Sequence, residues 1–188
     1  MKKINLMKVF VCMLVVTIGL VGCGPKSQEQ NDVGDNASGI KINKIENLAH
    51  AKLMAESMDI TKEELPEELL SLANLNGKEP EYIVTLSTKT DPSSEEFDLL
   101  HDYVLYFRDE EKNTSIKVSA SKGQAPLRDY FFEEVSNNKS TIGGVPAKIF
   151  QYEDRYIVNL EKGEYYFDIE TSGLTEDEMI KIVEEVVK

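Results

Sequence analysis

The sequence predicts an α+β domain: an antiparallel sheet of about six strands, with helices before it and a closing helix packed on one face. Three observations predict this class. Apolar residues recur at helical spacing near residue 50, they alternate with polar residues through the middle and end of the chain, and a helix start signal follows the last alternating segment. The predicted domain spans residues 40–188, about one domain's worth of chain.

Two helices are expected at the start of this domain. The first runs from Lys44 to Ser57, because Asn43 can cap it and Glu46 follows the cap by three residues. The second runs from Pro66 to Asn74, since proline suits a first helical turn and glutamates follow it directly.

Three strands are expected next, over residues 81–88, 102–108 and 114–121. The third has the pattern of a strand buried on one side only. Its apolar side chains are expected to point inward and its polar ones outward to solvent. The inward set is Ile116, Val118 and Ala120, and the outward set is Ser115, Lys117 and Ser119.

Three more strands are expected over residues 145–152, 155–161 and 164–170. Two-residue turns separate them, at Glu153-Asp154 and Lys162-Gly163. Connections this short join antiparallel neighbours, because a parallel crossover needs a dozen residues or more.

The closing helix has the clearest local signal in the chain. Thr175 is expected to cap it, with Glu178 at the third position completing a capping box, and Leu174 can pack against Met179. The predicted apolar stripe is Met179, Ile180, Val183, Val186 and Val187.

The first 22 residues are predicted to be an export signal. Lys2, Lys3 and Lys8 are its only charges, and an uncharged apolar run covers residues 9–20. The run is short for a membrane span, which needs about 20 apolar residues, although an uncleaved anchor helix is the alternative.

Leu20-Val21-Gly22-Cys23 resembles the bacterial lipobox. This resemblance implies cleavage after Gly22 and a diacylglyceryl thioether on Cys23, so that the chain is held at the cell membrane on its extracytoplasmic side. Two or more acyl chains give stable anchoring where one is marginal. Residues 24–39 are polar and glycine-containing, which predicts a flexible tether.

Cysteine usage agrees with this interpretation. The other cysteine, Cys12, lies inside the export signal and would leave with it, so no internal disulfide is expected in the mature chain. The formal net charge is −13, with 21 basic and 34 acidic residues. Such an acidic chain repels phosphate backbones, and no nucleic-acid partner is expected.

No catalytic, metal or cofactor motif stands out. His50 and His101 lie far from any cysteine and outside HExxH, which gives no support for zinc or Cys–His catalysis. Ser-x-x-Lys occurs twice, at Ser119 and Ser136, but no Lys-Thr-Gly follows either. The sequence therefore predicts a protein that is not an enzyme and carries no cofactor and no metal.

An aromatic cluster, Tyr130-Phe131-Phe132, lies between predicted strands. One interpretation is packing at the end of the sheet. The other is a groove that binds a lipid, a glycan or a partner peptide.

The C-terminal third resembles an uncharacterised domain of Gram-positive lipoproteins and of extracytoplasmic parts of anti-sigma-factor-like proteins. The matching features are Gly143-Gly144 before a strand, the aromatic strands after it, and Gly173-Leu174-Thr175 before an acidic helix start. The resemblance implies a curved sheet akin to lipoprotein-carrier domains and carries no catalytic residues.

Three hypotheses for function follow. The first is a non-catalytic envelope lipoprotein that binds a partner protein or a ligand. The second is a carrier or chaperone that holds a lipid or a lipoprotein. The third is a small envelope hydrolase with a carboxylate site.

Overall fold

The computed structural model describes residues 34–35, 39–50, 53, 55–88, 102–132 and 138–188. Contacts divide the chain into Met1–Gln30 and Asn31–Lys188, and every described residue belongs to the second unit. The predictions for Gly22, Cys23, His101 and Ser136 lie outside the described residues.

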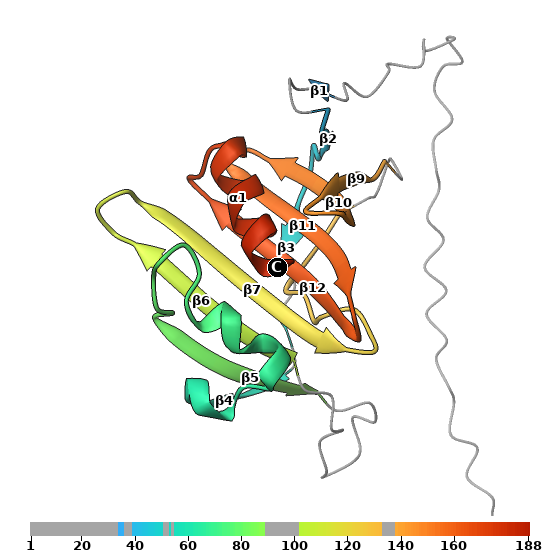
Figure 1. Ribbon diagram of the computed structural model, residues 1–188. Helices are drawn as coiled ribbons and strands as arrows, with labels where there is room; N and C mark the ends of the chain where they lie inside the picture. The colour runs from blue at the N-terminus through green and yellow to red at the C-terminus, as the bar shows by residue number, and fades with distance from the viewer. Residues whose placement is uncertain (1–33, 36–38, 51–52, 54, 89–101, 133–137) are drawn as a thin grey trace, which may run out of the picture. The chain divides into compact units, whose positions relative to one another are not determined.

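The described elements follow one another as strands, two 3-10 helices, more strands and one α-helix (Figure 1). The first group comprises β1 (Gly34–Asp35), β2 (Lys41–Lys44), β3 (Ala49–His50), β4 (Ala55–Asp59), η1 (Lys62–Glu64) and η2 (Glu67–Ala73). The second comprises β5 (Tyr82–Thr88), β6 (Asp102–Asp109), β7 (Thr114–Lys122), β8 (Tyr130–Phe131), β9 (Ser140–Ile142), β10 (Val145–Tyr152), β11 (Arg155–Lys162), β12 (Tyr165–Ser172) and α1 (Glu176–Val186).

Within the described residues, ten strands form one sheet. Nine follow the order β1-β2-β10-β11-β12-β7-β6-β5-β4, and β9 pairs with β10. β3 and β8 form a separate two-stranded sheet. The α+β class is therefore confirmed, but the prediction of about six antiparallel strands is wrong in number, and β2 pairs with β10 in parallel.

The six strands that were predicted form the middle of the sheet. They are β10, β11, β12, β7, β6 and β5, and all pairs within this set are antiparallel. The first predicted turn is confirmed at Glu153, whose φ of 54° lies in the left-handed region. The second lies one residue later than predicted, because β11 extends to Lys162.

The predicted helix from Lys44 to Ser57 is wrong. Its range holds the end of β2, then β3 and β4. Asn43, the expected cap, is buried in β2 and donates through Nδ2 to the carbonyl oxygen of Ile149 at 3.0 Å. Pairing with β10 therefore overrides the local helical signal, as tertiary contacts commonly do.

The second predicted helix exists as the 3-10 helix η2. Pro66 precedes it as the N-cap, and Leu69, Leu72 and Ala73 are buried. A 3-10 helix has three residues per turn, so residues 69 and 72 lie on the same side.

The main core lies between the sheet and the helices α1 and η2. α1 covers part of one face of the sheet (Figure 1), and Leu69 and Leu72 of η2 belong to the same core cluster. The predicted capping box is present, with Thr175 Oγ1 accepting from Glu178 N and Glu178 Oε2 accepting from Thr175 N at 2.8 Å. The predicted stripe is right except at Ile180, which is only partly buried, whereas Ile182 is buried.

Two glycines of the C-terminal resemblance have positions that a side chain would disturb. A Cβ on Gly143 would lie 2.5 Å from Val187 Cγ2, and one on Gly173 would lie 2.7 Å from the carbonyl oxygen of Asn113. Both residues also have positive φ, of 57° and 71°. The absence of a side chain at Gly143 therefore lets Val187, at the end of α1, come close, and its absence at Gly173 lets the β6–β7 turn come close.

Among the described residues, α1 and the 3-10 helices are too short or too polar to cross a membrane.

Candidate functional site

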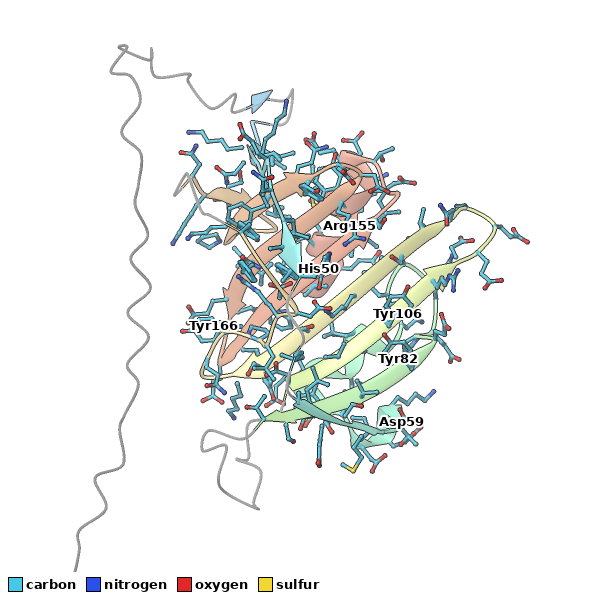
Figure 2. The ribbon with its side chains drawn as sticks, turned by 180° about the vertical axis from the view of Figure 1, so that it is seen from behind. His50, Asp59, Tyr82, Tyr106, Arg155 and Tyr166 are labelled. Atoms are coloured by element: carbon cyan, nitrogen blue, oxygen red, sulfur yellow. The ribbon has the colours of Figure 1, made fainter. Side chains whose placement is uncertain are left out.

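A row of polar side chains crosses the sheet on the face that points away from α1. Lys148, Asn159 and Asp168 are register partners on β10, β11 and β12, and Ser119 of β7 continues the row. They share a face because alternate residues of a strand point the same way. Figure 2 looks onto this face, with Tyr166 of β12 labelled.

The prediction that this face of β7 is open to solvent is wrong. Ser119 is 2% exposed, and Ser121, two residues further on the same face, is 1% exposed. Residues 125–132, here named the cover segment, lie against this face and end in β8, which pairs with β3. A one-strand pattern cannot reveal such a cover, because the cover comes from elsewhere in the chain.

Asp168 is the centre of the polar contacts beneath the cover segment. Its side chain is 2% exposed and accepts hydrogen bonds from three others: Arg128 Nε at 2.5 Å, Tyr130 Oη at 2.7 Å and Asn159 Nδ2 at 2.9 Å. A buried carboxylate is tolerated only when such donors replace its lost water. Burial and the neighbouring charge of Asp168 raise the pKa of Tyr130, which keeps the phenol a donor.

A second ion pair lies beside this centre. Lys117 Nζ of β7 is 2.7 Å from Glu170 Oε1 of β12 and 3.7 Å from Asp129 Oδ1 of the cover segment. Burial alone would lower the pKa of Lys117, but the charge and hydrogen bond of Glu170 outweigh it, and the pKa is raised. Together the two carboxylate centres attach the cover segment to the sheet.

Asp102 of β6 is, with Asp168, one of the two buried acids among the described residues, and it also lies under the cover segment. Its side chain is fully buried, and Oδ2 accepts from Leu127 N at 2.5 Å. Oδ1 and the hydroxyl of Ser121, its register partner on β7, have no hydrogen-bond partner among the described residues. Burial raises the pKa of Asp102, and the backbone N–H of Leu127 and the nearby Ser121 side chain, which lower it, offset this only in part.

We expect Asp102→Asn to stabilise the protein at neutral pH by about 1 kcal/mol, because the amide is uncharged and can donate to Ser121. Folding raises the pKa of this acid, so the native state holds more protons than the unfolded chain. The free energy of unfolding therefore falls as the pH rises. The gain should therefore shrink as the pH falls toward about 4, the ordinary aspartate value. Urea unfolding of the wild type and the variant at neutral pH and at about pH 4 measures this gain in the free energy of unfolding.

The control for this prediction is Asp59→Asn, which changes an exposed aspartate of β4 (Figure 2) and should give no such gain. A gain from Asp102→Asn that is equal at both pH values, or a loss at neutral pH, would contradict the explanation.

The aromatic cluster is split between two environments. Tyr130 is 4% exposed and Phe132 packs on Phe150 with ring centroids 4.8 Å apart, whereas Phe131 is 62% exposed. Tyr130 and Phe150 belong to a small apolar cluster separate from the main core. A ligand groove formed by residues 130–132 stays a prediction.

A pocket of about 580 Å³ opens where the cover segment meets β10, β11 and β12. Its charged and polar lining consists of Arg128, Lys139, Lys148, Asn159, Glu161 and Tyr166. Ala125, Pro126 and Pro146 supply apolar surface. Asn159 and Arg128 therefore belong both to this pocket and to the contacts of Asp168, which fixes their positions.

The histidine and serine candidates do not meet at this site. His50 is an exposed residue of β3 (Figure 2). Ser119 and Lys122 are three residues apart on β7 and so point to opposite faces. Lys122 pairs instead with Glu164 at 2.5 Å. Among the described residues, no three His, Cys, Asp or Glu side chains lie together as a metal site would require.

Sequence reasoning did not single out Arg128, Lys148, Asn159 or Asp168, and it considered Lys139 only as the lysine of the second Ser-x-x-Lys match. One signal was present: Asp168 and Glu170 alternate with Phe167 and Ile169 in a strand rich in aromatic residues. Charges on the second face of a central strand are typical of a face that carries a polar network. The basic residues gave no signal, because the fold alone brings them together.

The comparisons with known proteins concern the same part of the chain. Residues 78–186 match the model of a family described as "Domain of unknown function (DUF4367)". Neither the search of curated proteins nor that of solved structures finds a match.

Proposed function

The chain belongs to the DUF4367 family, whose model covers more than half of it, and from this premise we propose that its folded domain is a non-catalytic binding module of the cell envelope. The module takes a small ligand in the pocket between the cover segment and β10–β12. The lipobox-like Leu20-Val21-Gly22-Cys23 supports a lipid on Cys23 that holds the module at the outer side of the membrane.

The observation that carries this proposal is the pocket itself. Its volume of about 580 Å³ falls within the range of small-molecule sites, and several polar side chains converge on it from separate strands. The strands, and the hydrogen bonds that attach the cover segment to them, hold these groups in place before a ligand binds. This order lowers the entropy lost on binding.

The carboxylates around the pocket favour binding over catalysis. A general acid or base must reach the substrate within hydrogen-bond distance. Asp168 is instead engaged by Arg128, Tyr130 and Asn159 beneath the pocket. Glu161 is the one carboxylate among the described lining residues, and a glycosidase would need two facing each other.

The test is a ligand panel followed by backbone amide NMR on the full chain in a neutral detergent. The probes are N-acetylglucosamine, glycerol, glycerol 3-phosphate, tri-alanine and spermidine. We expect at least one probe to shift the amides of Asn159, Gly163 and Tyr166, which line the pocket. Ala125→Trp should abolish the shift, because the indole fills the pocket without changing its charge.

The matched control is Ser71→Trp, which places the same side chain on an exposed position of η2 and should leave binding intact. If no probe shifts these amides, or if Ala125→Trp binds as the wild type does, the pocket is not the binding site.

A further inference from the structure

The charge of the pocket is opposite to the charge of the chain. The sequence has 21 basic and 34 acidic residues, but the described lining of the pocket has three basic residues, Arg128, Lys139 and Lys148, and one acid, Glu161. A local reversal of this kind concentrates anions at the pocket against the repulsion of the surrounding surface.

Asp168 must be included in this charge balance. It neutralises Arg128 from below, but it is 2% exposed and offers no oxygen to the pocket. Among the described residues, the basic side chains of the lining are Arg128, Lys139 and Lys148, and the acidic ones at or beneath it are Glu161 and Asp168. The described groups are therefore three basic against two acidic, where the whole sequence has more acids than bases.

Arg128 is held ready to bind an oxyanion. Its Nε donates to Asp168, and its guanidinium carbon lies 5.8 Å from the centre of the Tyr130 ring. Its two terminal amino groups make no ion pair or hydrogen bond with the described residues. The end of the guanidinium is a planar fork, the arrangement that binds carboxylate or phosphate through two parallel hydrogen bonds.

The strand register places a lysine in line with this fork. Lys148, Asn159 and Asp168 are partners in one row, so the lysine projects from the same face as the carboxylate that holds Arg128. Lys139 lines the pocket from the segment before β9. A guanidinium and two ammonium groups suit a phosphate, which presents more accepting oxygens and more charge than one carboxylate.

The rest of the lining suits hydroxyl groups. Glu161 and Tyr166 are register partners on β11 and β12, and the amide oxygen of Asn159 remains as an acceptor once its nitrogen has donated to Asp168. Glu161 would also repel a second phosphate. From these features we propose that the pocket binds a phosphorylated polyol or sugar, with the phosphate on Arg128, Lys139 and Lys148. This inference rests on the proposed function and names the ligand class of the same pocket.

The phosphate could belong to a soluble molecule or to a lipid headgroup, and two arms of one experiment separate them. The full chain in a neutral detergent is titrated with glycerol 3-phosphate, or its micelles are doped with phosphatidic acid, while the amides of Asn159, Gly163 and Tyr166 are followed by NMR. A response to the soluble probe, or to the doped micelles alone, identifies the source, and either supports the inference.

The double variant Lys139→Gln/Lys148→Gln should weaken binding by about tenfold or more, because each lost charge-assisted hydrogen bond is worth about that factor. The control is the double variant Lys41→Gln/Lys181→Gln, which also removes two positive charges but at positions that do not line the pocket. Its affinity for glycerol 3-phosphate should stay within about twofold of the wild-type value. Equal responses to glycerol and glycerol 3-phosphate, or equal weakening by both double variants, would overturn the inference.

The outcome also separates this inference from the proposed function. If N-acetylglucosamine, tri-alanine or spermidine shifts the pocket amides and neither phosphate does, the pocket binds ligands but not phosphates. If no probe of any class shifts them, both proposals fail.

Discussion

Asp168→Ala is expected to lower the free energy of unfolding by about 3–5 kcal/mol, the range found when one partner of a buried charged pair is removed. The carboxylate is 2% exposed and accepts from Arg128, Tyr130 and Asn159. Alanine would leave the Tyr130 hydroxyl, itself buried, without its acceptor. Urea unfolding measures the loss.

The neighbouring residue provides the control. Ile169 is fully buried on the opposite face of the same strand, in the main core under α1. Ile169→Ala should cost a similar amount, about 2–5 kcal/mol, through a cavity. The two variants should differ in hydrogen exchange. Asp168→Ala should speed exchange in residues 125–132 beyond the global loss, whereas Ile169→Ala should lower protection throughout the sheet together.

A milder variant keeps the prediction testable if Asp168→Ala does not fold. Asp168→Asn keeps the shape and one acceptor but loses the charge, so it should cost less and still loosen the cover segment. A loss below about 1 kcal/mol for Asp168→Ala, or equal exchange profiles for the alanine variants, would contradict the role of Asp168.

The middle of the sheet was predictable because its strands are long and either alternate in polarity or, as in β6, are apolar on both faces. β5, β6, β7, β10, β11 and β12 have seven to nine residues each, enough for periodicity to show. The other strands have two to five residues. Segments this short carry no period, and their pairing depends on partners distant in the chain.

The false helix at residues 44–57 has a physical explanation. Ile45 and Leu48, three residues apart, both pack against the small cluster of Tyr130, Phe150 and Ile157. This spacing resembles one face of a helix, although the segment is irregular before β3. A shared apolar contact can therefore imitate helical periodicity.

The pocket was not predictable for a related reason. Arg128 and Asp168 are 40 residues apart, and Lys139 and Lys148 come from a different part of the chain from the cover segment. Residues 125–132 look like a connecting loop in the sequence. Only the fold shows that they cover a polar face.

Cys23→Ser is expected to abolish lipid labelling completely, whereas Cys12→Ser should leave it unchanged. The two cysteines are the only thiols in the chain, and the lipobox pattern assigns the lipid to the second of them. Growing the producing cells with an alkyne analogue of palmitate and detecting the label on the purified chain measures both variants. Label that persists in Cys23→Ser, or disappears in Cys12→Ser, would contradict the assignment.

Ligand binding should not depend on this lipid. The described lining residues of the pocket begin at Ala125, and Asp168, which holds Arg128, lies on β12 of the same sheet. Lipid-free Cys23→Ser chain should therefore bind glycerol 3-phosphate as the wild type does. The proposed lipid would act instead on location, because attaching a module to a surface raises its effective concentration there without any new contact. Since one acyl chain holds a protein only marginally and two hold it stably, the intact thioether would keep the pocket at the membrane.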